Sequence, residues 1–156
     1  MIDWQWLTFE AMTKDQLYQM LRIRQEVFAV EQNCVYLDVD GLDQNAWHLL
    51  ARHKSDNSAD KILGYLRVIY PGIKYMEPAI GRVLTIEQAR GTGLGKQLME
   101  TALMYIEKEY PNQAVRLSAQ QYLLRFYAGF GFQSVSEPYD EDGIPHVEML
   151  RPGKRL

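Results

Sequence analysis

Two stretches of the chain carry apolar residues at helical spacing and predict its two main helices. The first helix is expected to begin at Thr13, which can form a capping box with Gln16, and to run to about Val30. The second is expected over Gly93–Tyr110 and ends at Pro111, because proline cannot continue a helix. The apolar stripes are Leu17, Met20, Leu21, Val27 and Phe28 in the first helix and Leu94, Leu98, Ala102 and Ile106 in the second.

Runs rich in β-branched and aromatic residues predict strands around these helices. Gln121–Ala128 is expected to be a short helix, Lys54–Lys61 a polar hairpin loop, and residues 31–46 a loop or a broken helix. No internal repeat or linker is present, so residues 1–156 are expected to form a single domain of the α/β (α+β) class, with helices on the faces of one sheet. The predicted strands are Trp4–Phe9, Trp47–His53, Ile62–Tyr70, Ala79–Ile86, Ala114–Ser118, Phe132–Val135 and His146–Leu150.

Composition and charge exclude several classes of function. Cys34 is the only cysteine, which excludes an internal disulfide and a cysteine-based zinc cluster, and we expect no metal. A net charge of −3 argues against a nucleic-acid partner, whose phosphates need a basic surface. No segment approaches the ~18 apolar residues of a membrane span, and the first residues lack the pattern of a signal peptide. We therefore expect a cytoplasmic protein with no nucleic-acid and no membrane partner.

The most informative segment is the glycine-rich turn from Arg90 to Lys96, between a predicted strand and a predicted helix. Glycine permits positive φ and close approach of the backbone to a ligand, and the start of a helix presents unpaired N–H groups and partial positive charge. With two cations beside it, the turn favours phosphate binding, although three glycines can also make a plain tight connection. The glycine spacing is that of neither a Walker loop nor a dinucleotide fingerprint.

This turn resembles the [RQ]-x-x-G-x-[GA] pyrophosphate loop of the GNAT N-acetyltransferase superfamily. The preceding strand Gly81–Ile86 and the following amphipathic helix stand where that family places them. The resemblance implies that the turn holds the pyrophosphate of coenzyme A and that the strand backbone pairs with the pantetheine arm. Glu87 departs from the family pattern, which often has proline there. The implied coenzyme contacts are Val83, Leu84 and Thr85 in the strand and Arg90, Gly91, Thr92, Gly93, Leu94, Gly95 and Lys96 in the turn.

A second segment resembles the same superfamily. Leu117–Gln120 and the following Phe126–Phe132 match its strand–helix unit that ends in F-Y-x-x-x-G-F. The resemblance implies that Tyr127 is the general acid that protonates the departing thiolate, and that Gln120 hydrogen-bonds the amides of the coenzyme. Without the resemblance, Tyr127 is more simply a packed ring, and Gln120 a cap at the end of its strand.

The amino-terminal half narrows the resemblance to the ElaA-like branch of GNAT proteins, through residues 22–34, 36–43 and 139–146. Membership implies the GNAT fold, with a central mixed, mostly antiparallel twisted sheet of six to seven strands flanked by about four helices. It also implies an N-acetyltransferase that moves an acetyl group directly from acetyl-CoA to a primary amine, in a small molecule or a peptide, without a metal. The sequence leaves open whether two copies form a homodimer.

The remaining candidates concern the acceptor amine. Arg24 lies on an apolar stripe, so we expect it either to pair with a buried acid such as Glu31 or Asp38 or to snorkel to the surface. Arg24, Asp38 and Asp40 are the candidate substrate-binding residues, because an acid-rich loop can attract a cation, although such charges are commonly just solvated. Glu31 and His146 are candidates for the base that accepts the amine proton, although such a histidine is often only a structural hydrogen-bonder.

Two other functions remain open at this point. An acyl-homoserine-lactone synthase resembles the chain in its arginine-bearing first helix and acidic loop. It is expected to lack so complete a pyrophosphate loop, because its acyl donor is usually a carrier protein. A non-catalytic sensor of coenzyme A would bind the coenzyme without turnover.

Overall fold

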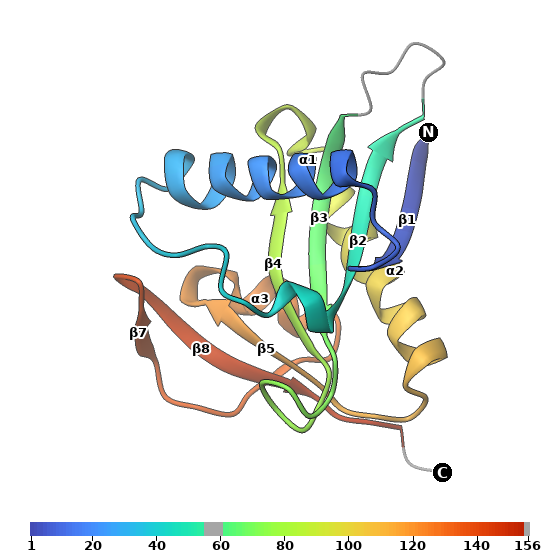
Figure 1. Ribbon diagram of the computed structural model, residues 1–156. Coiled ribbons are helices and arrows are strands. Elements are labelled where there is room, and N and C mark those ends of the chain that lie inside the picture. The colour runs from blue at the N-terminus through green and yellow to red at the C-terminus, as the bar shows by residue number, and fades with distance from the viewer. Residues whose placement is uncertain (55–60, 155–156) are drawn as a thin grey trace.

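One eight-stranded mixed sheet organises the computed structural model, which describes residues 1–54 and 61–154 (Figure 1). The strand order is β1-β2-β3-β4-β5-β8-β6, and β7 also pairs with β8. β4 and β5 are parallel and all other neighbours are antiparallel. The strands are β1 (Ile2–Thr8), β2 (Ala46–His53), β3 (Ile62–Ile69), β4 (Ala79–Thr85), β5 (Val115–Gln120), β6 (Gln133–Ser134), β7 (Tyr139–Glu141) and β8 (Ile144–Arg151).

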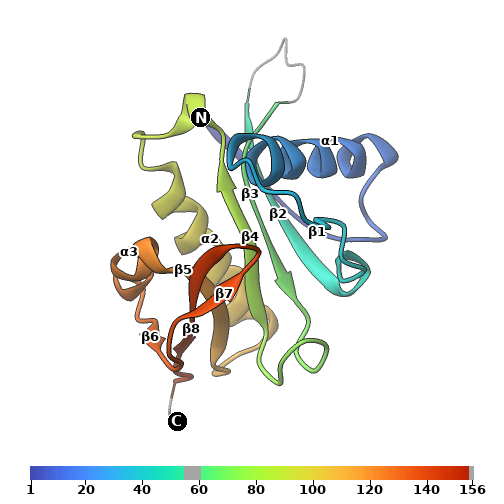
Figure 2. The same ribbon diagram turned by 90° about the vertical axis from the view of Figure 1, so that its left-hand side faces the viewer.

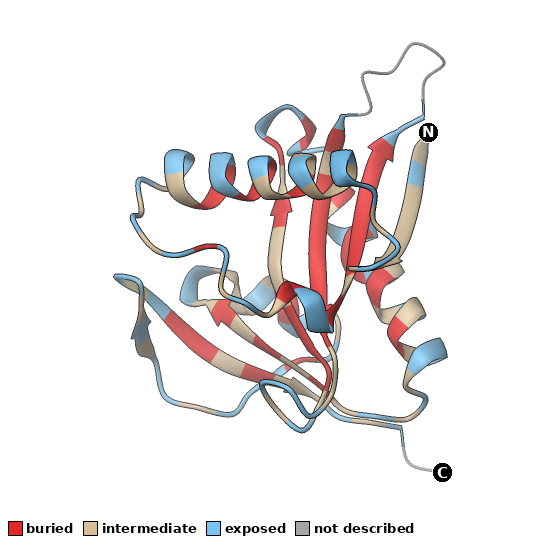
Figure 3. Cartoon of the chain, viewed as in Figure 1, coloured by how far each residue is buried: buried red, intermediate tan, exposed pale blue. Residues whose placement is uncertain are grey.

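Helices cover both faces of this sheet. α1 (Lys14–Arg24) crosses one face over β2, β3 and β4, and α2 (Leu94–Glu109) lies on the opposite face (Figures 1 and 2). The short α3 (Leu124–Ala128) follows β5. The buried residues run along the middle strands and the inner sides of α1 and α2 (Figure 3). Within the described residues, no helix is long and apolar enough to cross a membrane.

The predicted elements are present, with shifts of one or a few residues at their ends. Thr13 caps α1 as expected, because its hydroxyl accepts from the Gln16 amide at 3.1 Å and its amide donates to the Gln16 side chain at 2.8 Å. The first helix differs beyond Arg24, where residues 25–31 form wider π-helical turns that keep Val27 and Phe28 in the core. In the predicted hairpin loop, residues 55–60 lie outside the described part of the chain.

The described chain has eight strands and three α-helices, where six to seven strands and about four helices were expected. The sequence prediction missed β7, because its acidic residues suggested a loop. Asp142 and Gly143 at the turn into β8 have φ of 53° and 80°. A type I′ hairpin turn needs positive φ at both central residues, so the Asp-Gly pair was the signal that would have found this strand.

Candidate active site

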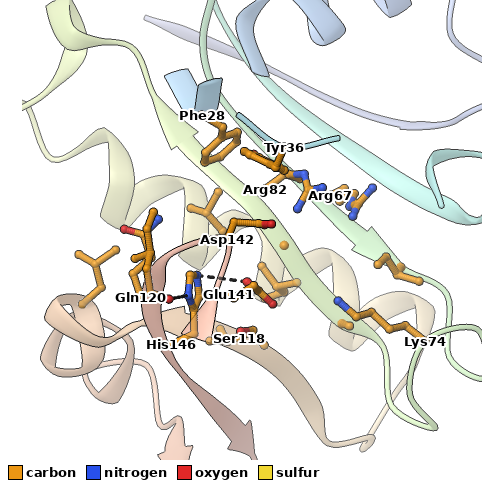
Figure 4. A pocket seen from close by; sticks show the side chains of 18 of the residues that line it. Phe28, Tyr36, Arg67, Lys74, Arg82, Ser118, Gln120, Glu141, Asp142 and His146 are labelled. Atoms are coloured by element: carbon orange, nitrogen blue, oxygen red, sulfur yellow. Dashed lines mark hydrogen bonds and ion pairs between the residues drawn. The ribbon is translucent and has the colours of Figure 1, made fainter. Parts of the chain in front are cut away.

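A cleft opens where β4 and β5 part (Figure 4). The two strands pair only at Ala79 with Arg116 and at Ile80 with Leu117. Among the residues that the structure describes, β4 beyond Ile80 has no strand partner on its β5 side. Its register with β3 also shifts there, and Arg82 takes a φ of 50°. A cavity of about 140 Å³ occupies the space between the diverging strands.

The glycine-rich turn follows β4 and leads into α2. Gly91 and Gly93 have φ of 78° and 84°, and a Cβ at either position would meet no atom within 4 Å. The backbone angle, rather than crowding, is therefore the reason for glycine at both positions. The Thr92 hydroxyl donates to the Ala89 carbonyl at 2.5 Å and fixes the turn. α2 then begins at Leu94, and the N–H groups of its first turn have no partner within the helix.

The side chain of Arg90 reaches back to the end of β4 and hydrogen-bonds two other predicted residues. Its guanidinium donates to the Thr85 carbonyl at 3.2 and 2.9 Å and to a carboxylate oxygen of Glu31 at 2.6 Å. Both members of this ion pair are exposed. Glu31 lines a second hollow, of about 580 Å³, between α1 and the end of β4, rather than the cleft. The structure therefore brings Glu31 to Arg90 at the glycine-rich turn and not to His146.

Tyr127 forms part of the cleft wall together with Gln120 and Leu123. Its side chain is largely buried, and its ring packs edge-on against Phe126 and Phe132 at centroid distances of 5.1 and 6.3 Å. Tyr127 is therefore a packed aromatic residue, as expected without the family resemblance, and it is also a lining residue of the cleft. Burial, and to a lesser extent the neighbouring Tyr122, raise the pKa of Tyr127. An ordinary phenol, with a pKa of about 10, already keeps its proton at neutral pH, and burial makes Tyr127 a weaker acid than that.

His146 lies on β8 directly beside Gln120, its partner in the β5–β8 ladder, and both of its ring nitrogens have a polar contact (Figure 4). Nδ1 is 2.8 Å from the Ile144 carbonyl, and Nε2 is 3.2 Å from the Glu141 carboxylate. Which ring nitrogen donates depends on the tautomer of the imidazole. Nearby, the hydroxyls of Tyr139 and Ser118 form a hydrogen bond. Glu141 is a cleft residue that the sequence reasoning missed, because the strand that carries it, β7, was missed.

Behind the cleft lies a set of alternating guanidinium and carboxylate groups, which we call the Arg–Asp network. Arg24 donates to Asp38 at 3.0 Å and to Asp43 at 2.7 Å. Arg67 donates to Asp43 at 2.9 Å and to Asp40 at 2.8 and 2.5 Å. The network consists of Arg24, Arg67, Arg82, Asp38, Asp40 and Asp43.

The network decides between the alternatives for Arg24. Arg24 is 0% exposed and pairs with Asp38, as expected, but not with Glu31, so the snorkelling alternative was wrong. Full burial also means that Arg24 acts on the cleft only through its partners. Burial by itself would raise the pKa of Asp40, but the hydrogen bonds and charge of Arg67 outweigh it and hold that pKa below its usual range.

Three positive and three negative groups make the Arg–Asp network neutral in sum. Asp38 and Asp40 therefore offer little free charge to a cationic substrate, which weakens the reason for predicting that they attract one. Arg82 joins the network from the bulge of β4, where its guanidinium pairs with Asp38 at 2.9 Å and Asp40 at 3.3 Å. The network thereby ties the acidic loop to the strand that lines the cleft.

Of the other predicted residues, Val83 and Gln120 line the cleft, whereas the side chain of Leu84 is buried in the core. Lys96 is exposed in the first turn of α2, where it lies 3.9 Å from Glu100. Arg67 and Arg82 line the cleft and were not predicted, because their strand positions alone gave no reason to separate them from ordinary strand residues.

Comparison with known proteins identifies the family to which this chain is similar. The family model of the acetyltransferase (GNAT) domain matches residues 8–151. The crystal structure of an acyl-CoA N-acyltransferase from Pseudomonas aeruginosa is 42% identical, with a TM-score of 0.89, and the match covers 97% of this chain and 99% of that one. ElaA of Escherichia coli is 39% identical, with a TM-score of 0.87 and coverage of 97% and 99%.

A more distant structure concerns the alternative function. A CoA-dependent acyl-homoserine-lactone synthase, solved with SAM and isopentyl-CoA, has a TM-score of 0.75 at 17% identity, and the match covers 99% of this chain and 84% of that one. At this identity the likeness shows the fold alone. Because this synthase depends on CoA, the acyl donor by itself does not distinguish a synthase from an acetyltransferase.

Proposed function

This chain belongs to the GNAT acetyltransferase family, in which it is similar to ElaA, and we propose that it transfers an acetyl group from acetyl-CoA to a primary amine. The family supports acyl-CoA N-acyltransferase activity in general. The observation that carries the finer proposal is the parting of β4 and β5, with the glycine-rich turn at one end of the cleft and Tyr127 in its wall. The proposal treats residues 1–156 as one catalytic domain.

The donor binds along β4 in this proposal. The N–H groups of the turn and of the first turn of α2, together with Arg90 and Lys96, hold the pyrophosphate. The backbone of Val83, Leu84 and Thr85 has no strand partner on the β5 side within the described part of the chain, and it pairs with the pantetheine arm in the way that an added strand would. The Gln120 side chain, at the end of β5, donates to or accepts from the pantetheine amides. Placing the two substrates next to each other supplies most of the rate.

The transfer is direct, within a ternary complex. The lone pair of the neutral amine attacks the thioester carbonyl carbon, and a backbone N–H of Leu84 or Thr85 stabilises the oxyanion. The carbon–sulfur bond then breaks, and the departing thiolate takes the proton of the Tyr127 phenol. The amine proton passes to the His146–Glu141 pair, either directly or through water, and the phenolate regains a proton from solvent. The products are an N-acetyl amine and free coenzyme A.

The His146–Glu141 pair fits this role better than Glu31 does. His146 lies in the cleft, whereas Glu31 lies 2.6 Å from Arg90 beside the second hollow. His146 holds the Glu141 carboxylate at 3.2 Å, and this carboxylate is the proton acceptor in our proposal. The acceptor is a small molecule or a peptide.

The experiment is a time course of thiol release from acetyl-CoA with panels of polyamines, amino sugars, amino acids and peptide amines. Release that depends on one class of amine establishes the transferase and identifies its acceptor group. Absence of release with every amine, together with measurable acetyl-CoA binding by titration calorimetry, would instead establish a non-catalytic coenzyme sensor.

A synthase-like acyltransferase is the second candidate, supported by the fold likeness to the CoA-dependent acyl-homoserine-lactone synthase. Since both functions use a CoA thioester, the product separates them. Mass spectrometry after reaction with acetyl-CoA and SAM would show a lactone for the synthase, and an N-acetyl amine without ring closure for the acetyltransferase.

A further inference from the structure

The last backbone carbonyl of β4 faces the open side of the strand. Ile86 donates its N–H to the Leu63 carbonyl at 2.9 Å, and Thr85, one residue earlier, lies opposite Gly64 of β3. Successive residues of an antiparallel strand alternate between bonding their neighbour and pointing away from it. The N–H and C=O of Thr85 therefore point away from β3, to the side where β5 has parted from β4.

The side chain of Arg90 covers this carbonyl. Its Nε and Nη2 both donate to the Thr85 oxygen, at 3.2 and 2.9 Å, and Nη2 also donates to Glu31 Oε2 at 2.6 Å. An added strand would donate its own N–H to this oxygen, so the guanidinium takes the place of that donor. We call Arg90, Glu31 and Thr85 together the Arg90 latch.

The Arg90 latch has to open before a pantetheine amide can reach the Thr85 carbonyl. Arg90 begins the glycine-rich turn, where the pyrophosphate binds in the proposed function. A pyrophosphate carries more negative charge than the single carboxylate of Glu31, so it is the stronger partner for the guanidinium. The side chains of Arg90 and Glu31 are 41% and 38% exposed, and exposed ion pairs are weak, so the protein itself opposes this exchange little.

We propose that the Arg90 latch selects the acyl donor. It disfavours pantetheine thioesters that lack a pyrophosphate, because Arg90 covers the edge of β4 that the arm must pair with. The pyrophosphate of a coenzyme A thioester draws Arg90 away and so uncovers the edge for its own arm. This role rests on the coenzyme site of the proposed function and leaves the acceptor open.

The two roles of Arg90 act in opposite directions, which makes them separable. As a phosphate ligand, Arg90 strengthens the binding of coenzyme A. As the cover of Thr85, it weakens the binding of pantetheine. A residue that only bound phosphate would leave the affinity for pantetheine unchanged, and a residue that only kept the turn folded would support both ligands.

The test measures the Kd of coenzyme A by calorimetry and the Kd of pantetheine by NMR titration, so it needs no acceptor. Arg90→Ala should weaken coenzyme A about tenfold and tighten pantetheine about threefold to fivefold, because it removes a phosphate ligand and an exposed latch. Glu31→Gln keeps Arg90 but loosens the latch, so it should tighten both ligands by about fivefold or less. The matched control is Lys108→Ala, an exposed lysine at the far end of α2, which should change neither Kd.

Inorganic pyrophosphate supplies the phosphate charge without the arm. At a concentration that displaces coenzyme A in competition, it should tighten pantetheine binding to the wild type about threefold, because it draws Arg90 from Thr85. The effect should vanish in Arg90→Ala. The same pattern is expected in kcat/KM when S-acetylpantetheine replaces acetyl-CoA, with any amine that supports thiol release.

Pantetheine binding that Arg90→Ala leaves unchanged or weakens overturns the latch, whatever happens to coenzyme A. If Arg90→Ala does not fold, Glu31→Gln decides in its place, and an unaltered Kd of pantetheine counts against the latch. Pyrophosphate that displaces coenzyme A without tightening pantetheine overturns the opening by the donor. Absence of thiol release with every amine overturns the transferase while both Kd values still decide the latch, and a failure to bind coenzyme A overturns both.

Discussion

Replacing Asp43 by asparagine removes one carboxylate from the buried Arg–Asp network. Asp43 is 4% exposed and accepts hydrogen bonds from Arg24 at 2.7 Å and from Arg67 at 2.9 Å. Asparagine has nearly the same shape and keeps one acceptor oxygen, but it leaves a net positive charge among buried guanidinium groups. Breaking a buried ion pair by removing one partner costs about 3–5 kcal/mol, and the remaining acceptor places this variant near the lower value, about 3 kcal/mol.

The loss is large compared with the total stability of a domain, about 5–15 kcal/mol. For a domain of this length, 1 kcal/mol shifts Tm by about 2–4 °C, so Asp43→Asn should lower Tm by about 6–12 °C. Urea unfolding followed by circular dichroism gives the free energy directly. Asp3→Asn is the matched control, because Asp3 is exposed on β1, and it should change stability by less than about 0.5 kcal/mol.

Acid unfolding gives an independent measure of the same network. Burial alone would raise the pKa of Asp43, but the charges and hydrogen bonds of Arg24 and Arg67 outweigh it and lower that pKa. A carboxyl with a lowered pKa in the folded state stabilises above its unfolded pKa of about 3.9, and that contribution is lost as the pH falls through the folded value. Below about pH 4 the wild type should therefore lose stability more steeply than Asp43→Asn. A loss below about 1 kcal/mol at pH 7, or identical acid profiles, would refute this reasoning.

Three further predictions concern the proposed chemistry. Tyr127→Phe should lower kcat about tenfold to a thousandfold, with the Kd of acetyl-CoA nearly unchanged, and an unchanged kcat at saturating substrates would remove Tyr127 from the mechanism. Arg90→Glu should raise the Kd of acetyl-CoA about tenfold or more in calorimetry, because it reverses a charge beside the pyrophosphate, and an unaltered Kd would contradict the phosphate site. Glu31→Gln removes a carboxylate that competes for Arg90, so it should tighten acetyl-CoA binding by about fivefold or less at low salt and leave kcat unchanged. A large fall in kcat for Glu31→Gln would restore Glu31 as the base.

The candidate site was only partly visible in the sequence. The glycine-rich turn could be predicted because its function depends on local chemistry, namely positive φ at Gly91 and Gly93 and a helix start directly after them. Glu141 could not be found without β7, whose acidic residues suggested a loop, and only the Asp142-Gly143 turn that follows them signalled a hairpin. Arg67 has no local signal at all, because its position in the cleft and its pairing with Asp40 and Asp43 depend on a loop that lies about 25 residues away along the chain.

The sequence by itself determined the class of fold and the position of the main elements, because helical and strand periodicities, caps and turn residues act over a few positions along the chain. Only the tertiary structure determined which charged side chains are neutralised by a neighbour of opposite charge. Asp38, Asp40 and Asp43 read as an acidic loop in the sequence, yet in the fold they neutralise three arginines that come from α1, β3 and β4. Electrostatic interactions depend on distance and burial in space, and neither quantity is encoded in the separation of residues along the chain.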